Sequence, residues 1–123
     1  MQGLHYTEDH SWLREEGDGF ITIGITDHAQ EQLGDVVFVQ LPETGHHFSI
    51  GDEVVVIESV KAAGDIRMPV DGRIEVVNHA LVDEPSLVNT LPEAERWFLK
   101  IKADQPALPE KLMDAQSYLA HVG

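Results

Sequence analysis

One lysine, Lys61, lies between two runs of residues that both favour extended backbone. Residues 54–57 before it are β-branched and uncharged, which is typical of a strand buried on at least one face. Small residues at 62–64 follow, where the chain should reverse, and a second extended run at 66–70 leads to the turn pair Asp71-Gly72. This pattern predicts a tight β-hairpin that holds one long primary amine in solvent. Spacing alone also allows an ordinary surface lysine at a turn.

Short β-prone runs that end in turn residues recur along the chain. Such runs at close spacing are typical of an all-β sandwich or barrel with peripheral helices. Residues 35–41 are apolar on both faces, which predicts a central, well-covered strand. Further strands are predicted at residues 11–15, 20–25 and 73–77, within 78–83, and at 97–102, where Trp97, Leu99 and Ile101 should face the core.

Helices are expected only at the periphery of this β-structure. Residues 27–33 should form a short helix that Asp27 caps and Gly34 ends. Residues 85–89 should form one helical turn, followed by a loop over 90–96. Near the C-terminus, helix is predicted at residues 110–113 and 114–120, with Leu112, Met113, Tyr118 and Leu119 docked on the barrel.

Length and composition limit the classes of function. A chain of 123 residues suits one domain, here residues 1–123, with a β-sandwich core at about 1–103 and a helical segment at about 109–121. A net charge of −14 argues against nucleic acid and anionic membranes, and favours partners with basic docking faces. With no transmembrane run and no signal-peptide pattern at its start, the sequence leads us to expect a cytoplasmic protein.

Chemistry at the protein's own side chains is expected to be limited. The chain has no cysteine, which excludes disulfides, thiolate catalysis and thiolate metal sites, so redox chemistry would need an attached group. His46 and His47 are adjacent, and neighbours in a strand point to opposite faces, so we expect no metal site there. Lys61 has Glu58 and Asp65 nearby and no predicted burial to lower its pKa, so no catalytic role is expected for the unmodified amine.

The segment Glu58-Ser59-Val60-Lys61-Ala62-Ala63, with Asp65 and then Pro69-Val70 and Gly72 after it, resembles the lipoylation site of the glycine cleavage system H protein family. Biotin carriers, which are similar in fold, set their lysine between methionines, whereas Val60 and Ala62 flank Lys61 here. The resemblance extends over nearly the whole chain, through Tyr6-Thr7, Trp12-Leu13, residues 23–30, 33–42 and 87–89, Trp97 and residues 100–102.

The resemblance implies a flattened barrel-sandwich hybrid of two small antiparallel sheets, as in lipoyl and biotinyl carriers, with short peripheral helices and a C-terminal helix. It implies lipoic acid on Lys61 and a carrier subunit rather than an enzyme. Such a carrier shuttles an aminomethyl group and then electrons between a pyridoxal-phosphate glycine decarboxylase, an aminomethyl transferase and dihydrolipoamide dehydrogenase. A lipoyl ligase or transferase would modify it.

The resemblance also assigns roles around Lys61, each with a structural alternative. Glu58 and Gly72 match positions that help the lipoylating enzyme to recognise the lysine, or they serve hairpin geometry. Asp65 matches an acid that holds the cationic amine of the loaded arm in a surface cleft, or it is a solvated turn residue. His28 matches a histidine near that cleft at a helix start, or it only neighbours the helix cap.

Three departures from the family pattern leave the glycine role open. The family's His-Glu-Trp is His10-Ser11-Trp12 here, and its glutamate helps to hold the amine, although Asp9 could replace that carboxylate. Gly64 stands where a serine is usual, and residues 92–96 replace a Pro-Tyr-Gly loop. One alternative is an H-protein-like lipoate carrier of a heterodisulfide-reductase-like sulfur-oxidation system, which would need no pocket for an amine. The other is an unmodified scaffold or regulatory module.

Overall fold

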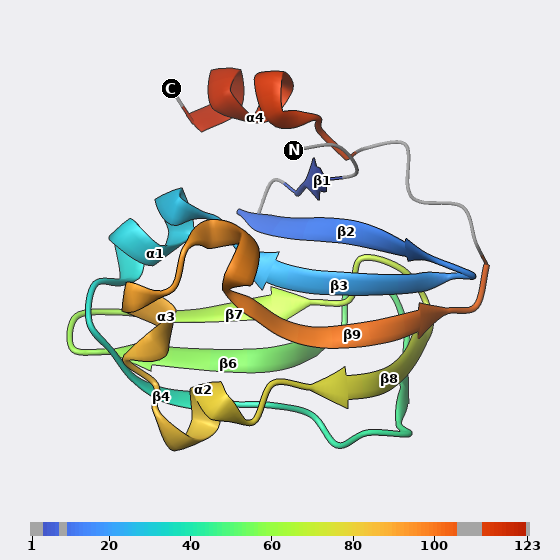
Figure 1. The fold of residues 1–123 in the computed structure, drawn as a ribbon, viewed down its shortest axis with the longest axis horizontal. Helices are drawn as coiled ribbons and strands as arrows, with labels where there is room; N and C mark the ends of the chain where they lie inside the picture. Colours follow the sequence, from blue (N-terminus) through green and yellow to red (C-terminus); the bar gives the residue numbers. More distant parts are fainter. Residues whose placement is uncertain (1–3, 8–9, 106–111, 123) are drawn as a thin grey trace.

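Two antiparallel β-sheets pack against each other in the computed structural model, which describes residues 4–7, 10–105 and 112–122 (Figure 1). The larger sheet has the strand order β1-β2-β3-β9-β8-β5 and the smaller has the order β4-β6-β7. The predicted β-sandwich with short peripheral helices is therefore confirmed. The strands are β1 Leu4–Tyr6, β2 Ser11–Gly17, β3 Phe20–Ile25, β4 Val36–Gln40, β5 His47–Phe48, β6 Glu53–Ser59, β7 Ala63–Arg67, β8 Gly72–Val77 and β9 Trp97–Ala103. The helices are α1 Asp27–Leu33, α2 Ala80–Asp83, α3 Leu87–Thr90, the 3₁₀ turn η1 Glu93–Glu95 and α4 Ala115–Val122.

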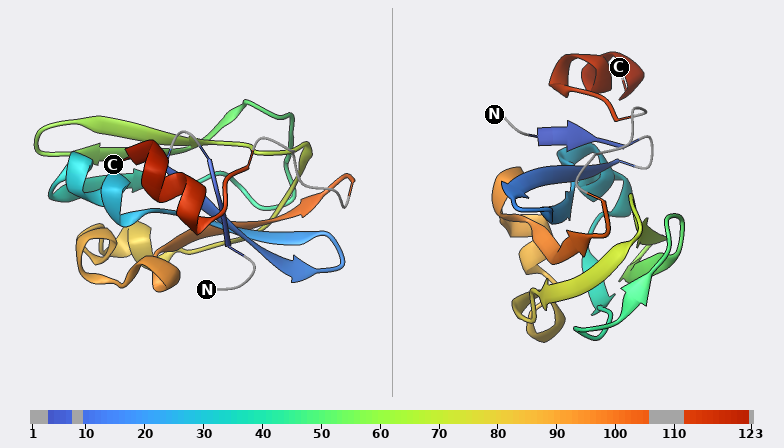
Figure 2. Two further views of the ribbon diagram at one scale, coloured as in Figure 1. Left: turned by 90° about the horizontal axis from the view of Figure 1, so that it is seen from above. Right: turned by 90° about the vertical axis from the view of Figure 1, so that its right-hand side faces the viewer.

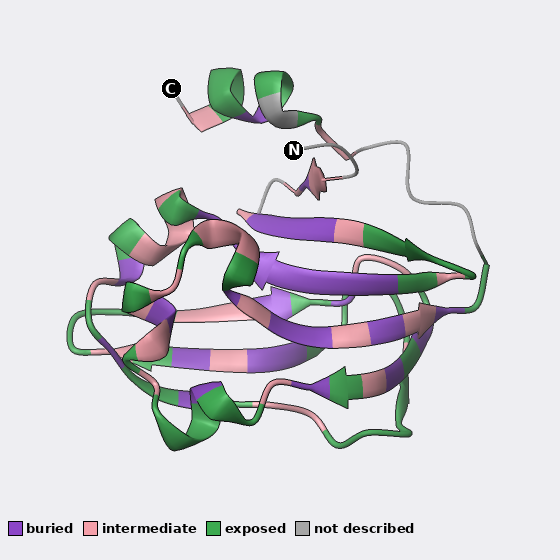
Figure 3. Ribbon diagram, in the orientation of Figure 1, coloured by how far each residue is buried: buried purple, intermediate pink, exposed green. Residues whose placement is uncertain are grey.

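The main core lies between the inner faces of the two sheets (Figure 3). Ile23 from the larger sheet and Ile57 and Ile66 from the smaller are at most 1% exposed, and full burial of such a side chain contributes about 1.5–3 kcal/mol. Strand β9 departs from the predicted alternation, because Phe98 is buried together with Leu99. The β3–β9 register shifts at this point, and the bulge turns both side chains inward.

The prediction of a central, well-covered strand at residues 35–41 was wrong. β4 is an edge strand of the smaller sheet, and β6 is the central one. Val37 is 56% exposed and Phe38 44% exposed. The β4–β6 register shifts between Val36 and Phe38, which leaves Val37 as the extra residue and directs it to solvent.

Local hydrogen bonds correct two further predictions. Thr26, not Asp27, caps α1, because its Oγ1 accepts from the Ala29 N–H at 3.2 Å, whereas Gly34 ends the helix with a φ of 73° as expected. Residues 80–83 form α2 rather than a strand, since the Asp83 N–H donates to the His79 carbonyl and closes a helical turn. The helical turn expected at 85–89 is present as α3, and η1 lies in the loop expected at 90–96.

The C-terminal helix α4 lies outside β1, as Figure 2 shows. Tyr118 stacks on Tyr6 at 4.7 Å, and both join the buried Trp12 in a second apolar cluster. Met113 is not helical as predicted, because it bridges to Tyr6 through two backbone hydrogen bonds of 2.8 Å. Leu119 is 66% exposed rather than docked, since only one face of α4 meets β1. Leu112 packs on the main core and Met113 on the second cluster, as predicted. The start of the predicted C-terminal helix, residues 109–111, lies outside the described residues. The division of the domain at about residue 103 stays a prediction.

Candidate functional site

The turn between β6 and β7 holds Lys61 in solvent. Glu58 pairs with Ala63 in the last register position, and the Ser59 N–H donates to the Ala62 carbonyl at 2.8 Å. The Ser59 hydroxyl donates to the same carbonyl and accepts from the Ala62 N–H, each at 2.9 Å. The predicted hairpin is therefore present, and one serine side chain fixes the turn. Lys61 is exposed and forms no ion pair within the described part of the chain.

The hairpin tip rests on the connection between α1 and β4. The Val60 N–H donates to the Asp35 carbonyl at 3.1 Å. A Cβ added at Gly34 would lie 2.8 Å from Lys61 Cε, so the stem of the lysine runs over this glycine. The Asn89 side chain secures the connection, because Nδ2 donates to the Gly34 carbonyl at 2.6 Å and Oδ1 accepts from the Val36 N–H at 2.8 Å.

A cleft of about 380 Å³ begins beside the hairpin and extends along α1 to His10. Its lining is mostly apolar, and Asp65 is the one carboxylate among the lining residues. Asp65 forms an exposed ion pair with Arg67 at 3.2 Å. The apolar lining is Ile25, Ala29, Leu33, Ile57, Ala63 and Gly64, and the polar lining is His10, Gln32 and Asp65. An apolar chain that ends in a cationic group would match this lining.

Gly64 lets Leu33 form part of the cleft wall. A Cβ at residue 64 would lie 3.2 Å from Leu33 Cδ2, which is tighter than ordinary van der Waals contact. Gly64, where the family usually has serine, thus allows α1 to pack closely against β7. Ser11, at the position of the family's glutamate, is only 5% exposed, and its N–H donates to Thr7 Oγ1 at 3.1 Å.

His28 is not among the residues that line the cleft. Its ring is 4.4 Å from the ring of His10, which does line the cleft. His10 Nδ1 and the Tyr118 hydroxyl are hydrogen-bonded at 2.8 Å, and the same hydroxyl bonds Thr26 Oγ1 at 2.7 Å. Burial raises the pKa of the Tyr118 hydroxyl, so this group stays neutral and joins α4 to the start of α1.

The remaining predicted site residues are dispersed. Glu58 is exposed next to the hairpin tip. Gly72 is buried at the start of β8, beyond the far end of β7, and a Cβ there would lie 2.6 Å from the Lys102 carbonyl oxygen. Close packing against β9 therefore explains why residue 72 is glycine. A role of Glu58 and Gly72 in recognition by the lipoylating enzyme stays a prediction. Asp9 lies outside the described residues.

Sequence reasoning missed Arg96, a buried cation in the segment that was expected to be a plain loop. The residue is 3% exposed. Its Nε donates to the Val88 carbonyl and Nη2 to the Leu91 carbonyl, each at 2.7 Å, and Nη1 pairs with Asp27 at 3.1 Å. Arg96 therefore fastens α3 to the start of α1, next to the cleft. No spacing pattern marks such a residue, because its partners are mostly backbone carbonyls.

The described residues contain no group of three metal-binding side chains. His46 pairs with Glu43 at 3.3 Å and His47 with Asp104 at 2.6 Å, so the two adjacent histidines have different partners. Among the described helices, none combines the length and apolarity needed to cross a membrane.

Comparisons with known proteins agree over almost the full length. The family model described as "Glycine cleavage H-protein" matches residues 4–122. The chain is 53% identical over 119 residues to the glycine cleavage system H protein of Chromohalobacter salexigens, covering 97% of this chain and 91% of that one. It is 56% identical over 117 residues to the H proteins of Salmonella arizonae and Escherichia coli, covering 95% of this chain and 91% of each. A crystal structure of the Mycobacterium marinum H protein superposes with a TM-score of 0.89 at 37% identity, covering 100% of this chain and 98% of that chain.

Proposed function

The chain belongs to the glycine cleavage H-protein family, and from this premise we propose that Lys61 is its lipoyl attachment site. Members of the family are carrier subunits rather than catalysts, and the barrel-sandwich fold is the one expected of a lipoyl carrier. The observation that supports the proposal most is the placement of Lys61: an exposed amine with no ion pair among the described residues, on a fixed turn next to a cleft with mostly apolar walls.

The residues of the cleft suit a lipoyl group. Leu33, Ile57 and Ala63 would hold its apolar chain, and burial of each CH₂ contributes about 0.8 kcal/mol. When bound, the group supplies a dithiolane that accepts a carbon unit and then electrons. The chain contributes an accessible tether, a high effective concentration at successive enzymes and a surface that excludes water from the resting arm.

We assign the cationic end of the cargo to Asp65. Ser11 has replaced the glutamate of the family pattern, and Asp65 is the carboxylate that the described cleft lining retains. A carboxylate beside a partly enclosed cleft attracts an amine more strongly than it would in bulk water. His10 also lines the cleft, and the ring of His28 contacts the ring of His10.

The cargo proposed is the aminomethyl group of glycine, followed by electrons. The partners would be a pyridoxal-phosphate glycine decarboxylase, an aminomethyl transferase, dihydrolipoamide dehydrogenase and the lipoylating enzyme, in the cytoplasm. The names of the relatives support this role over that of a sulfur-oxidation carrier.

Two measurements test the proposal. The chain is produced with a lipoyl ligase and lipoate, and peptide mass spectrometry looks for a lipoyl mass on Lys61; its absence would favour an unmodified scaffold. The lipoylated chain is then supplied to glycine decarboxylase, and exchange of labelled CO₂ into glycine is followed beside an active H protein. Negligible exchange by a fully lipoylated chain would reject the glycine role and leave the sulfur-oxidation carrier.

A further inference from the structure

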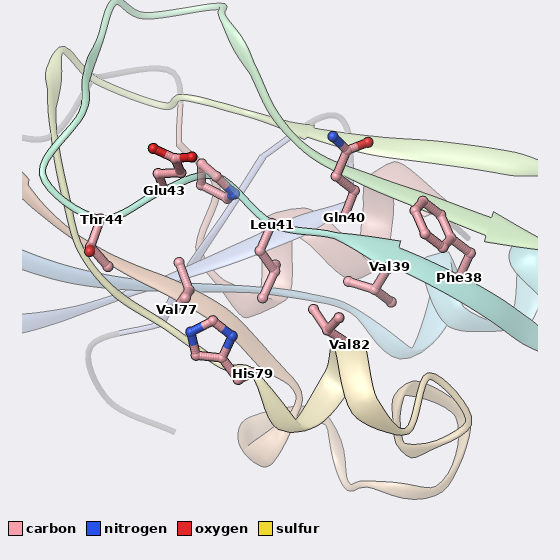
Figure 4. Close-up of a pocket in the computed structure, with 10 residues that line it drawn as sticks. Phe38, Val39, Gln40, Leu41, Glu43, Thr44, Val77, His79 and Val82 are labelled. Atoms are coloured by element: carbon pink, nitrogen blue, oxygen red, sulfur yellow. The ribbon is translucent and has the colours of Figure 1, made fainter.

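A second hollow, of about 590 Å³, lies between β4 and the β8–α2 connection (Figure 4). Its lining shares no residue with the cleft beside Lys61. The apolar part comes from Phe38 and Leu41 on one side and Val77 and Val82 on the other. The proposed carrier role leaves this groove without a function.

The groove runs along an open strand edge. Among the described strands β4 pairs only with β6, so backbone N–H and C=O groups on its other edge lie outside the ladder, although the Val36 N–H already donates to Asn89 Oδ1. Beside this edge Phe38 is 44% exposed and Val82 is 42% exposed. Isolated exposed apolar residues are common, but here two of them border one hollow beside a strand edge. An extended peptide segment is the occupant that this combination fits.

The charged residues around the groove indicate the sign of the charge that the occupant should carry. No lysine or arginine is among the lining residues, whereas Glu43 lies at one end with its side chain 86% exposed. Asp83 is exposed on α2, and Glu58 is the cross-strand neighbour of Phe38. A second copy of a chain with a net charge of −14 would meet like charge here, so a basic partner is favoured.

We propose that an extended apolar segment containing lysine or arginine, from a partner enzyme, binds along β4 in this groove. The choice of enzyme rests on the proposed function: it is one of the decarboxylase, the aminomethyl transferase and the dehydrogenase. The Val60 N–H in the hairpin tip donates to the Asp35 carbonyl just before β4, so the strand that borders the groove starts beside the hairpin that carries Lys61. The arm cleft stays open, because the groove uses none of its residues.

The test measures the Kd of the full-length lipoylated chain for each of the three purified enzymes. Val82→Lys removes an apolar contact and sets a positive charge against a basic segment, and it should weaken binding of at least one enzyme about tenfold, equivalent to about 1.4 kcal/mol. Val82→Glu removes the same apolar contact but adds a negative charge that attracts a basic segment, so it should weaken binding less than Val82→Lys. Val76→Lys is the matched control, since Val76 is 44% exposed but is not among the lining residues, and it should stay within about twofold of the unchanged chain.

Binding is read directly, so the result does not depend on turnover, and glycine exchange by the unchanged chain tests the proposed function separately. Circular dichroism first establishes that each variant is folded. The proposal is overturned if no enzyme binds, if neither Val82 variant changes any Kd, or if Val82→Glu weakens binding as much as Val82→Lys. It is also overturned if the unchanged chain sediments as a dimer that Val82→Lys dissociates, because the groove would then belong to self-association.

Discussion

Lys61 lies directly over Gly34, so close that a Cβ at residue 34 would come within 2.8 Å of Lys61 Cε. Gly34 also has a φ of 73° and a ψ of −148°, a backbone conformation that is essentially restricted to glycine. One residue thus ends α1 and makes room for the side chain that we propose to be modified. The two requirements can be separated experimentally.

Gly34→Ala should destabilise the fold by about 1–3 kcal/mol through backbone strain, and it should also slow lipoylation by displacing the Lys61 stem. Gly45→Ala is the matched control, because Gly45 has a φ of 88° and nothing within 4 Å of an added Cβ. Urea denaturation and the rate of lipoyl incorporation are the two measurements. Equal lipoylation rates for the two variants would show that the contact between residues 34 and 61 has no effect on modification.

Lys61→Arg should leave the free energy of unfolding within about 0.5 kcal/mol of the unchanged chain, because an exposed tip residue contributes little burial. The guanidinium cannot take the amide-linked lipoyl group, so the variant should be inert as a carrier. Intact mass and glycine exchange check both points. Exchange that survives in this variant would remove the tether mechanism.

Arg96→Met should cost about 3 kcal/mol, because the carbonyls of Val88, Leu91 and Ile25 lose a donor beside a buried side chain. The lost pair with Asp27 adds little, since the Asp27 side chain is 66% exposed and becomes hydrated. Arg73→Met, which removes an exposed guanidinium paired with Glu75, is the control and should cost less than about 1 kcal/mol. Similar urea midpoints for the two variants would contradict the structural role given to Arg96.

Asp65→Asn should leave lipoylation unchanged and lower glycine exchange about three- to tenfold, which corresponds to about 0.7–1.4 kcal/mol of lost attraction for the amine. Stability should change by less than about 1 kcal/mol, because the Arg67 pair is exposed. Asp104→Asn removes a carboxylate outside the cleft and serves as the control. If the two variants retained equal exchange activity, Asp65 would not hold the cargo.

The stability of the fold should fall in alkali partly through Tyr118. The pKa of its hydroxyl is raised above 10.0 by burial, so the folded state retains this proton more strongly than the unfolded state. The resulting stabilisation is present below pH 10 and is lost as the pH rises through the raised pKa. Tyr118→Phe keeps the stacking on Tyr6 but removes this titration, so its urea stability should fall less steeply above pH 10. Parallel curves for the two proteins would rule out this contribution. The decrease in stability with pH that remains in Tyr118→Phe includes a contribution from Tyr6, because burial also raises the pKa of Tyr6.

Local sequence signals predicted the elements that depend on neighbouring residues. The Lys61 hairpin follows from β-branched residues on one side and small residues on the other, and the end of α1 follows from Gly34. The exposed face of β4 could not be predicted, because it depends on a register shift and on the place of β4 at the sheet edge. Both are tertiary properties, and an apolar run looks the same in a central strand and in an edge strand with exposed side chains.

Some residues around the candidate site could likewise be identified from local sequence, and others depend on tertiary contacts. Lys61 and Asp65 could be identified from a continuous motif of the chain. Arg96, Asn89 and Tyr118 could not be identified as parts of the site. Arg96 and Asn89 bond main-chain carbonyls, which carry no side-chain signature, and Tyr118 bonds Thr26, which is distant in sequence.

The bond between Val60 and Asp35 and the serine-locked turn hold the backbone on both sides of Lys61 in place. The travel of anything attached to Lys61 is therefore set by the covalent length of one side chain and its adduct, with no contribution from a moving loop. An enzyme served by this protein must bring its reaction centre within that radius, and the path from its surface to the centre can be no longer than a single extended chain.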